Sequence, residues 1–180
     1  MRSTAFLLLA LPLAAQEGPS EAELHVRKLR PAEGMTLTLW AAEPQLQNPV
    51  AIAHDEKGRL FVAETHRYRT SVLDIRHYLD WYQEDLACRS VEDREAMVRR
   101  RMGDRASKLA GESERVRLLE DRDGDGRADA STVFAQGFDT ISDGIASGLL
   151  ARGGDVYFAN VPNLWVLKDR DGDEIGRAHV

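Results

Sequence analysis

Four aspartates recur at a spacing that suits a metal ion in the stretch DRDGDGRAD. Asp121, Asp123, Asp125 and Asp129 occupy positions one, three, five and nine of a D-x-D-x-D-G loop, and this spacing turns the carboxylates toward one point. Calcium suits such hard oxygen ligands, and carboxylates that converge without a cation repel one another. Position twelve is Thr132 in place of the bidentate glutamate of an EF-hand. We therefore expect a structural calcium site, with a solvated Asp-Gly hairpin as the alternative.

The pentapeptide DRDGD occurs again near the end of the 180 residues, as part of a longer internal repeat. RVRLLEDRDGD at 115–125 aligns with NLWVLKDRDGD at 163–173, and KGRLFVAE at 57–64 aligns with GGDVYFAN at 153–160. The first pair is 48 residues apart and the second pair 96. The two offsets agree if the first unit holds an insertion of 48 residues between its second and third strands.

The insertion is predicted to be helical and the rest of the repeat to be strands. Within 66–113, apolar residues recur at helical spacing, and Ser90 followed by Asp93 can cap a helix that carries Met97 and Val98 inward. Elsewhere, short apolar runs are separated by turn-forming dipeptides. The predicted strands are 35–40, 50–53, 60–63, 116–119, 132–135, 145–150, 156–159 and 164–167.

Four-stranded units of about 40 to 50 residues are typical of the blades of a β-propeller. We therefore predict an all-β fold: an incomplete β-propeller of about two four-stranded blades, with a helical insertion in the first. Blade one covers about 50–137, and blade two begins near residue 143 and loses its last strand where the sequence ends. Two blades cannot close a ring. Residues 32–173 are then the N-terminal part of a propeller whose further blades belong to the same polypeptide.

The repeat places a set of polar residues at one mouth of the propeller channel. Glu64 and Asn160 are equivalent residues at the end of the second strand of each unit, and His66, Arg67 and Tyr68 follow the first of them. These residues are candidates for binding an anionic or sugar-like ligand, and His66 is also a candidate catalytic group. The alternative is that they clamp the helical insertion through hydrogen bonds and an ion pair.

The first residues have the pattern of a secretory signal peptide. A positive charge precedes the apolar run 5–13 and small residues follow it, so we assign 1–15 to a signal peptide and 16–31 to a linker. The protein is then exported, to the periplasm or the cell envelope, and no later run is long enough to span a membrane. The net charge of −6 disfavours a nucleic-acid partner. Cys88, the only cysteine, can form neither an internal disulfide nor a CxxCH haem site.

Along residues 30–173 the chain resembles a known family. The stretches that carry the likeness are AAEPQLQNPVAIAHDEKGRLFVAETHRY, SVLDIRHYLDWYQEDLACRSVEDR, RVRLLEDRDGDGRAD and VFAQGFDTISDGIASGLLARGGDVYFANVPNLWVLKD. They are similar to the N-terminal propeller of large exported proteins of planctomycetes and verrucomicrobia, described as membrane-bound dehydrogenases or as haem-binding proteins with a CxxCH motif. The resemblance implies a propeller similar to those of soluble quinoprotein glucose and sorbosone dehydrogenases, often followed by a C-terminal c-type cytochrome domain.

The resemblance also implies where a catalytic base would lie. In the quinoprotein dehydrogenases a histidine base precedes the inner strand of a blade, and the comparable stretch here, ISDGIASG, holds Asp143. This aspartate is either a general base toward an alcohol or the cap of a turn, and its presence disfavours pyrroloquinoline quinone (PQQ) as a cofactor. Two functions follow: a dehydrogenase that passes electrons to haem c in a cytochrome domain of the same polypeptide, or a non-catalytic module that binds a small molecule or a glycan.

The second acidic loop departs from the repeat at Glu174, where Gly126 of the first loop predicts a glycine. The G that begins a glycine codon, joined to the common sequencing adapter AGATCGGAAGAGCACACGTC, reads GAG-ATC-GGA-AGA-GCA-CAC-GTC and translates as EIGRAHV. These are residues 174–180. We therefore predict that they are adapter read-through rather than native sequence, and we assign no function to Arg177 or His179.

A genomic read across this junction tests the adapter hypothesis directly. We expect codon 174 to encode glycine and the codons after it to differ from those of EIGRAHV. A read that encodes the same seven residues would refute the hypothesis.

Overall fold

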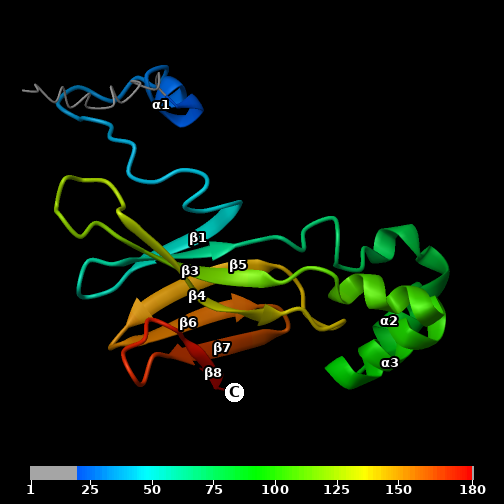
Figure 1. The fold of residues 1–180 in the computed structure, drawn as a ribbon. Helices are drawn as coiled ribbons and strands as arrows, with labels where there is room; N and C mark the ends of the chain where they lie inside the picture. The colour runs from blue at the N-terminus through cyan, green and yellow to red at the C-terminus, as the bar shows by residue number, and fades with distance from the viewer. Residues whose placement is uncertain (1–19, 180) are drawn as a thin grey trace, which may run out of the picture. The chain divides into compact units, whose positions relative to one another are not determined.

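The computed structural model describes residues 20–179 (Figure 1). The chain divides into two compact units, a short one that ends at Leu39 and a larger one from Trp40 onward. The larger unit holds all the strands of the described residues and the helical insertion. The predicted signal peptide, residues 1–15, lies outside the described residues.

The short unit contains one helix, α1 (Glu21–Val26), within the segment predicted to be a linker. Its first turn is closed by a reciprocal pair of hydrogen bonds. The Ser20 hydroxyl accepts the Glu23 N–H at 3.2 Å, and the Glu23 carboxylate accepts the Ser20 N–H at 2.9 Å. This capping box starts the helix. The strand predicted at 35–40 does not form.

Four strands form the first sheet: β1 (Pro49–His54), β2 (Leu60–Glu64), β3 (Glu114–Glu120) and β4 (Ala130–Phe138). They pair antiparallel in chain order. A tight turn joins β1 to β2, because the Asp55 carboxylate accepts the N–H groups of Lys57 and Arg59, each at 2.9 Å. Gly58 completes this turn with a φ of 80°, which favours glycine.

Four further strands form the second sheet: β5 (Ala146–Arg152), β6 (Asp155–Asn160), β7 (Asn163–Lys168) and β8 (Arg177–His179). All strands predicted from residue 50 onward are present. The repeat predicted no last strand for this unit, whereas the short β8 pairs antiparallel with β7. Residues 177–179 belong to the stretch predicted to be adapter read-through, and that hypothesis stays a prediction.

The two sheets pack face to face around one apolar core (Figure 1). Edge-to-face contacts of aromatic rings add to this packing: the ring centroids are 4.9 Å apart both in the Phe61–Phe134 pair and in the Phe138–Phe158 pair. The fold is thus mainly β, with two packed antiparallel sheets. The buried members of the core are Phe61, Ala63, Val116, Leu118, Phe134, Ala135, Phe138, Ala146, Ala151, Val156, Phe158 and Leu167.

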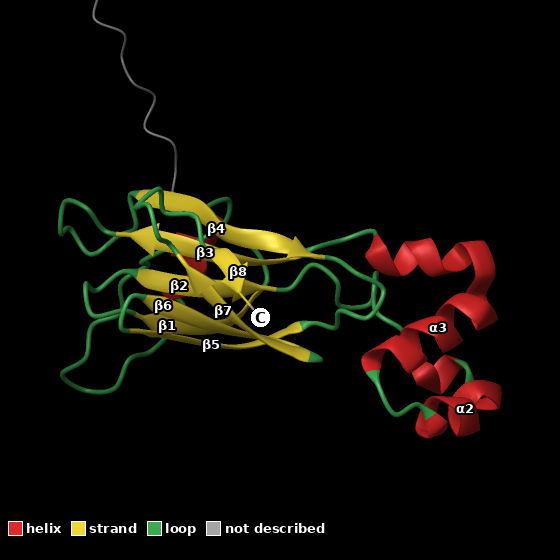
Figure 2. Ribbon diagram, turned by 90° about the horizontal axis from the view of Figure 1, so that it is seen from below, coloured by secondary structure: helices red, strands yellow, loops and turns green. Residues whose placement is uncertain are grey.

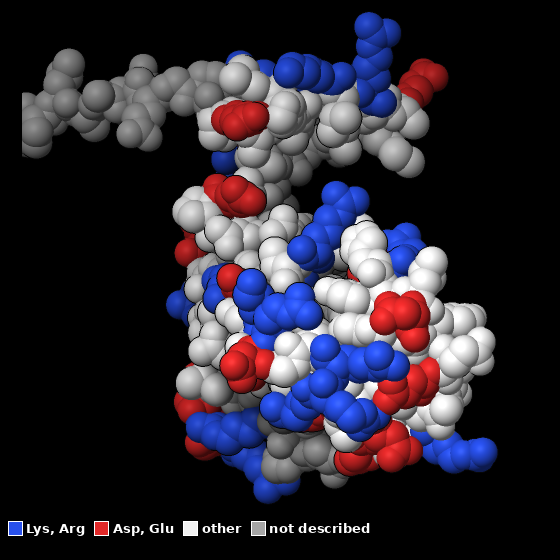
Figure 3. Space-filling model, turned by 90° about the vertical axis from the view of Figure 1, so that its right-hand side faces the viewer, with Lys and Arg blue, Asp and Glu red and all other residues white. Residues whose placement is uncertain are grey.

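Helical segments fill the insertion between β2 and β3, inside the predicted range, and lie beyond one end of the strands (Figure 2). Ser90 caps α3 as predicted, because its hydroxyl accepts the Asp93 N–H at 3.1 Å. Met97 and Val98 point inward and pack with Trp81 in a separate small core. The helical segments are η1 (Ile75–His77), η2 (Leu79–Trp81), α2 (Tyr82–Ala87), α3 (Val91–Met102) and η3 (Gly103–Ala110). Basic and acidic side chains are interspersed on this side of the molecule (Figure 3).

We predict that Leu118→Ala and Leu164→Ala differ sharply in stability. Leu118 on β3 is 1% exposed, whereas Leu164 on β7 is 66% exposed. Truncating Leu118 leaves a cavity, so the free energy of unfolding should fall by about 2–5 kcal/mol. Truncating Leu164 should change it by less than about 0.5 kcal/mol. Urea unfolding followed by circular dichroism measures both, and equal losses would contradict this assignment of the core.

Candidate functional site

One end of the two sheets, here called the polar end, gathers most of the residues predicted to bind a ligand. β2 ends there at Glu64 and β6 at Asn160, and the helical insertion leaves and re-enters the first sheet at the same end (Figures 1 and 2). The acidic loops join β3 to β4 and β7 to β8 at the opposite ends of the strands. The polar end and the acidic loops are therefore separate sites.

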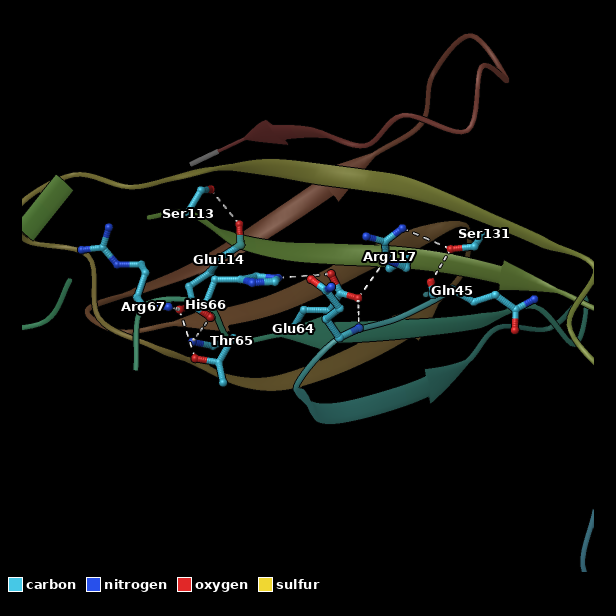
Figure 4. Close-up of polar contacts among 11 residues, drawn as sticks. Gln45, Glu64, Thr65, His66, Arg67, Ser113, Glu114, Arg117 and Ser131 are labelled. Carbon is cyan, nitrogen blue, oxygen red and sulfur yellow. Dashed lines mark hydrogen bonds and ion pairs between the residues drawn. The ribbon is translucent and has the colours of Figure 1, made fainter. Parts of the chain in front are cut away.

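Glu114, at the start of β3, is a fully buried carboxylate at the polar end that sequence reasoning did not single out. It accepts hydrogen bonds from the Arg67 N–H at 2.8 Å, the Thr65 hydroxyl at 3.1 Å and the Ala146 N–H at 3.1 Å (Figure 4). Because Ala146 begins β5, Glu114 ties the second sheet to the first. The sequence could have indicated its burial, because side chains alternate between the two faces of a strand and Glu114 lies two residues before the buried Val116.

Arg67 is fully buried, and backbone carbonyl oxygens enclose its guanidinium. Nη1 donates to the Glu112 oxygen at 2.8 Å. Burial lowers the pKa of this guanidinium, and nearby carboxylates, Asp143 first among them, act in the opposite direction. The oxygens that lie between 2.7 and 2.9 Å from Nη2 are those of Ser71, Leu109, Thr140 and Asp143.

The acceptors of Arg67 come from three separate places in the chain. Ser71 begins the insertion, Leu109 lies at its end, and Thr140 belongs to the loop between β4 and β5. One side chain therefore holds both ends of the insertion against a loop of the sheets. This is the clamping alternative predicted for the segment after β2, and it leaves the guanidinium inaccessible to a ligand.

Glu64, His66 and Arg117 form a second polar cluster (Figure 4). The buried Glu64 carboxylate accepts the Gln47 N–H at 2.7 Å and forms an ion pair with Arg117 Nε at 2.8 Å. His66 Nε2 lies 3.5 Å from the other Glu64 oxygen, at the limit of a hydrogen bond. Arg117 also donates to the Ser131 hydroxyl at 3.1 Å. This cluster joins strands within the first sheet.

The polar residues that follow β2 do not converge on one ligand site. His66 turns toward Glu64, whereas the Arg67 guanidinium is enclosed by the insertion. Tyr68 is 55% exposed, and Cζ of Arg69 lies 5.1 Å from the centre of its ring. The structure therefore places these predicted ligand-binding groups in three different surroundings.

Asp143 lines a pocket of about 350 Å³ at the polar end. The pocket lies between the insertion, the β4–β5 loop and the turn from β6 to β7, and Arg94 and Ser142 are the other polar side chains around it. No sequence motif marks such a pocket, because three distant segments build it. Its aliphatic wall consists of Val72, Leu73, Val91, Ile141, Val161 and Pro162.

The carboxylate of Asp143 holds its own turn and is only 5% exposed. Its Oδ2 accepts the Thr140 N–H at 2.8 Å, which is the turn-capping role. The other oxygen has no hydrogen-bond partner among the described residues. Nearby, Asn160 donates from Nδ2 to the Gly144 oxygen at 3.1 Å, and its buried Oδ1 has no partner within residues 20–179. Asp143 is thus the predicted catalytic residue that faces a cavity.

Three of the four aspartates predicted to bind calcium come together in the loop between β3 and β4. Asp121, Asp123 and Asp129 each offer a carboxylate oxygen, and these oxygens lie within 4.8 Å of one another. Asp125 is not in this group, and its Oδ1 accepts the Arg127 N–H at 2.8 Å. Three converging carboxylate oxygens fit the ligand preference of calcium.

The loop between β7 and β8 repeats this arrangement. Asp169, Asp171 and Asp173 also offer oxygens within 4.8 Å of one another. Arg177 donates to Asp171 at 3.0 Å and to Asp173 at 2.8 Å. The hydrogen bond from Arg177 lowers the pKa of the Asp173 carboxyl group. In this loop an arginine supplies a positive charge to two of the three carboxylates.

The fold and the polar end define a mainly β protein in which a helical insertion closes a pocket against two packed sheets. The chain belongs to a family described as a domain of unknown function, DUF7133, which matches residues 21–178 and so includes both sheets and the insertion. No curated protein and no solved structure matches the chain. In the described part of the chain, no helix has the length and apolar character needed to cross a membrane.

We predict that Arg67→Met destabilises the protein strongly, because it removes the buried guanidinium to which five backbone carbonyl oxygens are bound. The free energy of unfolding should fall by about 3–5 kcal/mol. Arg76→Met is the control, since Arg76 forms an ion pair with Asp74 that is exposed to solvent, and its loss should barely change the stability. Urea unfolding measures both changes, and a similar small loss in the two variants would contradict the clamp.

We predict that calcium raises the melting temperature of the protein relative to a chelator, because a cation relieves repulsion among the clustered carboxylates. The stabilisation should be about 1–3 kcal/mol at saturating calcium. Asp123→Asn should reduce this rise, whereas Asp125→Asn should retain it, since Asp125 lies outside the cluster. Differential scanning calorimetry measures the shift, and identical melting in calcium and chelator would rule out a stabilising site.

Proposed function

We propose that the chain supplies two adjacent units of a β-propeller and acts as a binding module for a small molecule or the end of a glycan. The observation that carries the proposal is the pocket at the polar end, which Asp143 lines and in which one oxygen of that carboxylate has no partner among the described residues. Its volume of about 350 Å³ lies within the range of small-molecule sites, about 300–1,000 Å³.

The arrangement of the sheets supports the propeller part of the proposal. Each sheet has its strands in chain order, the sheets pack face to face, and the first strands β1 and β5 lie next to each other. Neighbouring blades of a propeller have this relation, with their first strands around a central channel. The acidic loops then lie at the other end of the blades from the pocket, where calcium has a structural role.

The lining of the pocket limits the chemistry of its ligand. The wall is mostly aliphatic, and the polar groups are the Asp143 carboxylate, the Ser142 hydroxyl and the Arg94 guanidinium. Arg94 is held by Asp85 at 3.0 Å, which fixes its position beside the pocket. A carboxylate and an arginine in the lining of one pocket can bind hydroxyl groups of a ligand, the carboxylate as acceptor and the arginine as donor. A small polyhydroxylated ligand with an apolar face fits this combination.

The place of action is part of the same proposal. The signal-peptide pattern of residues 1–15 directs the protein to the periplasm or the cell envelope. Further blades of the same polypeptide would complete the ring.

A second candidate is a dehydrogenase in which Asp143 takes the proton of a substrate alcohol. It is favoured by the position of Asp143 in the pocket wall with one carboxylate oxygen unpaired among the described residues. Haem c would bind in a cytochrome domain elsewhere in the polypeptide, because the lone Cys88 cannot form a CxxCH motif. The polar groups around the pocket give no support for PQQ. A CxxCH in the coding sequence after residue 173 would support this candidate, and its absence would count against it.

We predict that the chain binds simple sugars or polyols through this pocket. Saturation-transfer NMR with D-glucose, D-galactose and myo-inositol tests binding to the wild type and to two variants. Val161→Trp fills the pocket from a residue at its wall, and Asp143→Asn removes the charge while keeping an oxygen for the Thr140 N–H. Asp143→Asn should weaken binding by roughly tenfold, the effect of losing one hydrogen bond to a charged group, and Val161→Trp should weaken it by occupying the space of the ligand.

Leu86→Trp is the matched control, because Leu86 is an exposed residue of α2 that does not line the pocket. It should bind the probes as the wild type does. Binding that persists unchanged in Val161→Trp, or no binding of any probe to the wild type, would contradict the proposed site.

A further inference from the structure

The first sheet packs on the core through two rows of residues that run across its first three strands. One row is Ala53, Phe61 and Leu118, and the other is Ala51, Ala63 and Val116, as the strand pairing shows. All six pack in the core between the sheets, and the four on β2 and β3 are buried. These rows are the face that the first sheet turns toward the second.

The second sheet has the same two rows, but they point away from the core. The internal repeat relates β2 to β6 and β3 to β7. Leu164 is 66% and Leu150 54% exposed, in contrast to the buried residues of the first sheet. We call these rows the free face: Leu150, Tyr157 and Val166 in one row, and Gly148, Ala159 and Leu164 in the other.

The contact between the two sheets is therefore head-to-tail. The second sheet meets the first with its opposite face, which carries Leu149, Phe158 and Leu167. A contact between two different faces of a repeated unit leaves one face open at the end of the row, and closes only when further units complete a ring. The free face is the surface that this arrangement leaves open.

A second copy of this chain does not supply the matching face. In the first sheet, the face equivalent to Leu149, Phe158 and Leu167 packs under residues 40–46. Trp40 and Leu46 cover Val62 and Leu119 there, so only the β1 edge of that face, with the exposed Ile52, stays open. A partner for the free face must present the same type of surface without this cover.

We infer that the free face binds a further four-stranded unit of the same repeat, through that unit's equivalents of Leu149, Phe158 and Leu167. The inference rests on the propeller arrangement of the proposed function but not on the pocket. Loss of sugar binding in Val161→Trp and burial of the free face are separate measurements, so one can fail while the other holds.

Hydroxyl-radical footprinting of two chains tests the inference. One is the full chain, and the other is the full chain followed by a second copy of residues 139–179, in which Lys168→Arg gives the peptide 153–168 of the added unit a different mass from that of the original. In the full chain, Tyr157 and Leu164 should be labelled and Leu118 protected. In the extended chain, labelling of the original Tyr157 and Leu164 should fall to the level of Leu118, whose protection in both samples shows that the first two sheets stay folded.

Leu164→Lys in the original unit should restore labelling of Tyr157 in the extended chain, because a buried unpaired charge opposes docking. Leu79→Lys is the control, since Leu79 is an exposed residue of the insertion, and it should leave the protection intact. Unchanged labelling of the free face in the extended chain would overturn the inference. Protection that already occurs in the full chain and grows with its concentration would also overturn it, in favour of a second copy as the occupant.

Discussion

A single buried guanidinium, that of Arg67, holds together the segments that build the polar end. Burying a charged group is costly unless hydrogen bonds satisfy it. Here backbone oxygens from both ends of the insertion and from the β4–β5 loop turn toward the same side chain. The side chain can reach these oxygens only when the insertion and the loop are both in place. The position of the pocket wall, which includes Asp143, depends on that condition.

Glu114 complements this clamp with the opposite charge. Its carboxylate accepts the backbone N–H of Arg67, and on its other side it accepts the N–H that begins β5. One buried anion and one buried cation thus fix the chain where it leaves the first sheet for the insertion and where it enters the second sheet. The hydrogen bonds of these two buried groups are directional, so they favour one arrangement of the segments at this end of the core.

The strands were predictable because their side chains alternate or repeat. The offset between KGRLFVAE and GGDVYFAN gave the position of β2 and β6, and the cap at Ser90 gave the start of α3. The segment 35–40 also alternates but forms no strand, since pattern alone does not supply a neighbouring strand. Alternation and helix capping are local features of the sequence. A predicted strand forms where a neighbouring strand is present to pair with it.

The candidate site was less predictable, because burial of a polar side chain depends on contacts between distant segments. Arginine is a residue type that often binds ligands, but the backbone oxygens that bind Arg67 lie up to 76 residues away in the sequence. In the sequence, Glu114 is marked only as a charged residue at a position of β3 whose side chain points into the core. Asp125 has the spacing of a metal ligand, but its carboxylate accepts the Arg127 N–H. The sequence therefore shows which polar residues are close along the chain. Which of them remain accessible to a ligand depends on how the insertion packs against the sheets.

The most direct test of this account is whether the insertion and the sheets unfold as one unit. Trp81 lies in the insertion, so its fluorescence, with Trp40 and Trp165 replaced by phenylalanine, reports on the insertion while circular dichroism reports on the sheets. We expect the two urea transitions to coincide when Arg67 is present, and the insertion to unfold at lower urea than the sheets in Arg67→Met. Separate transitions with Arg67 present, or coincident ones in Arg67→Met, would contradict the claim that this guanidinium joins the two parts.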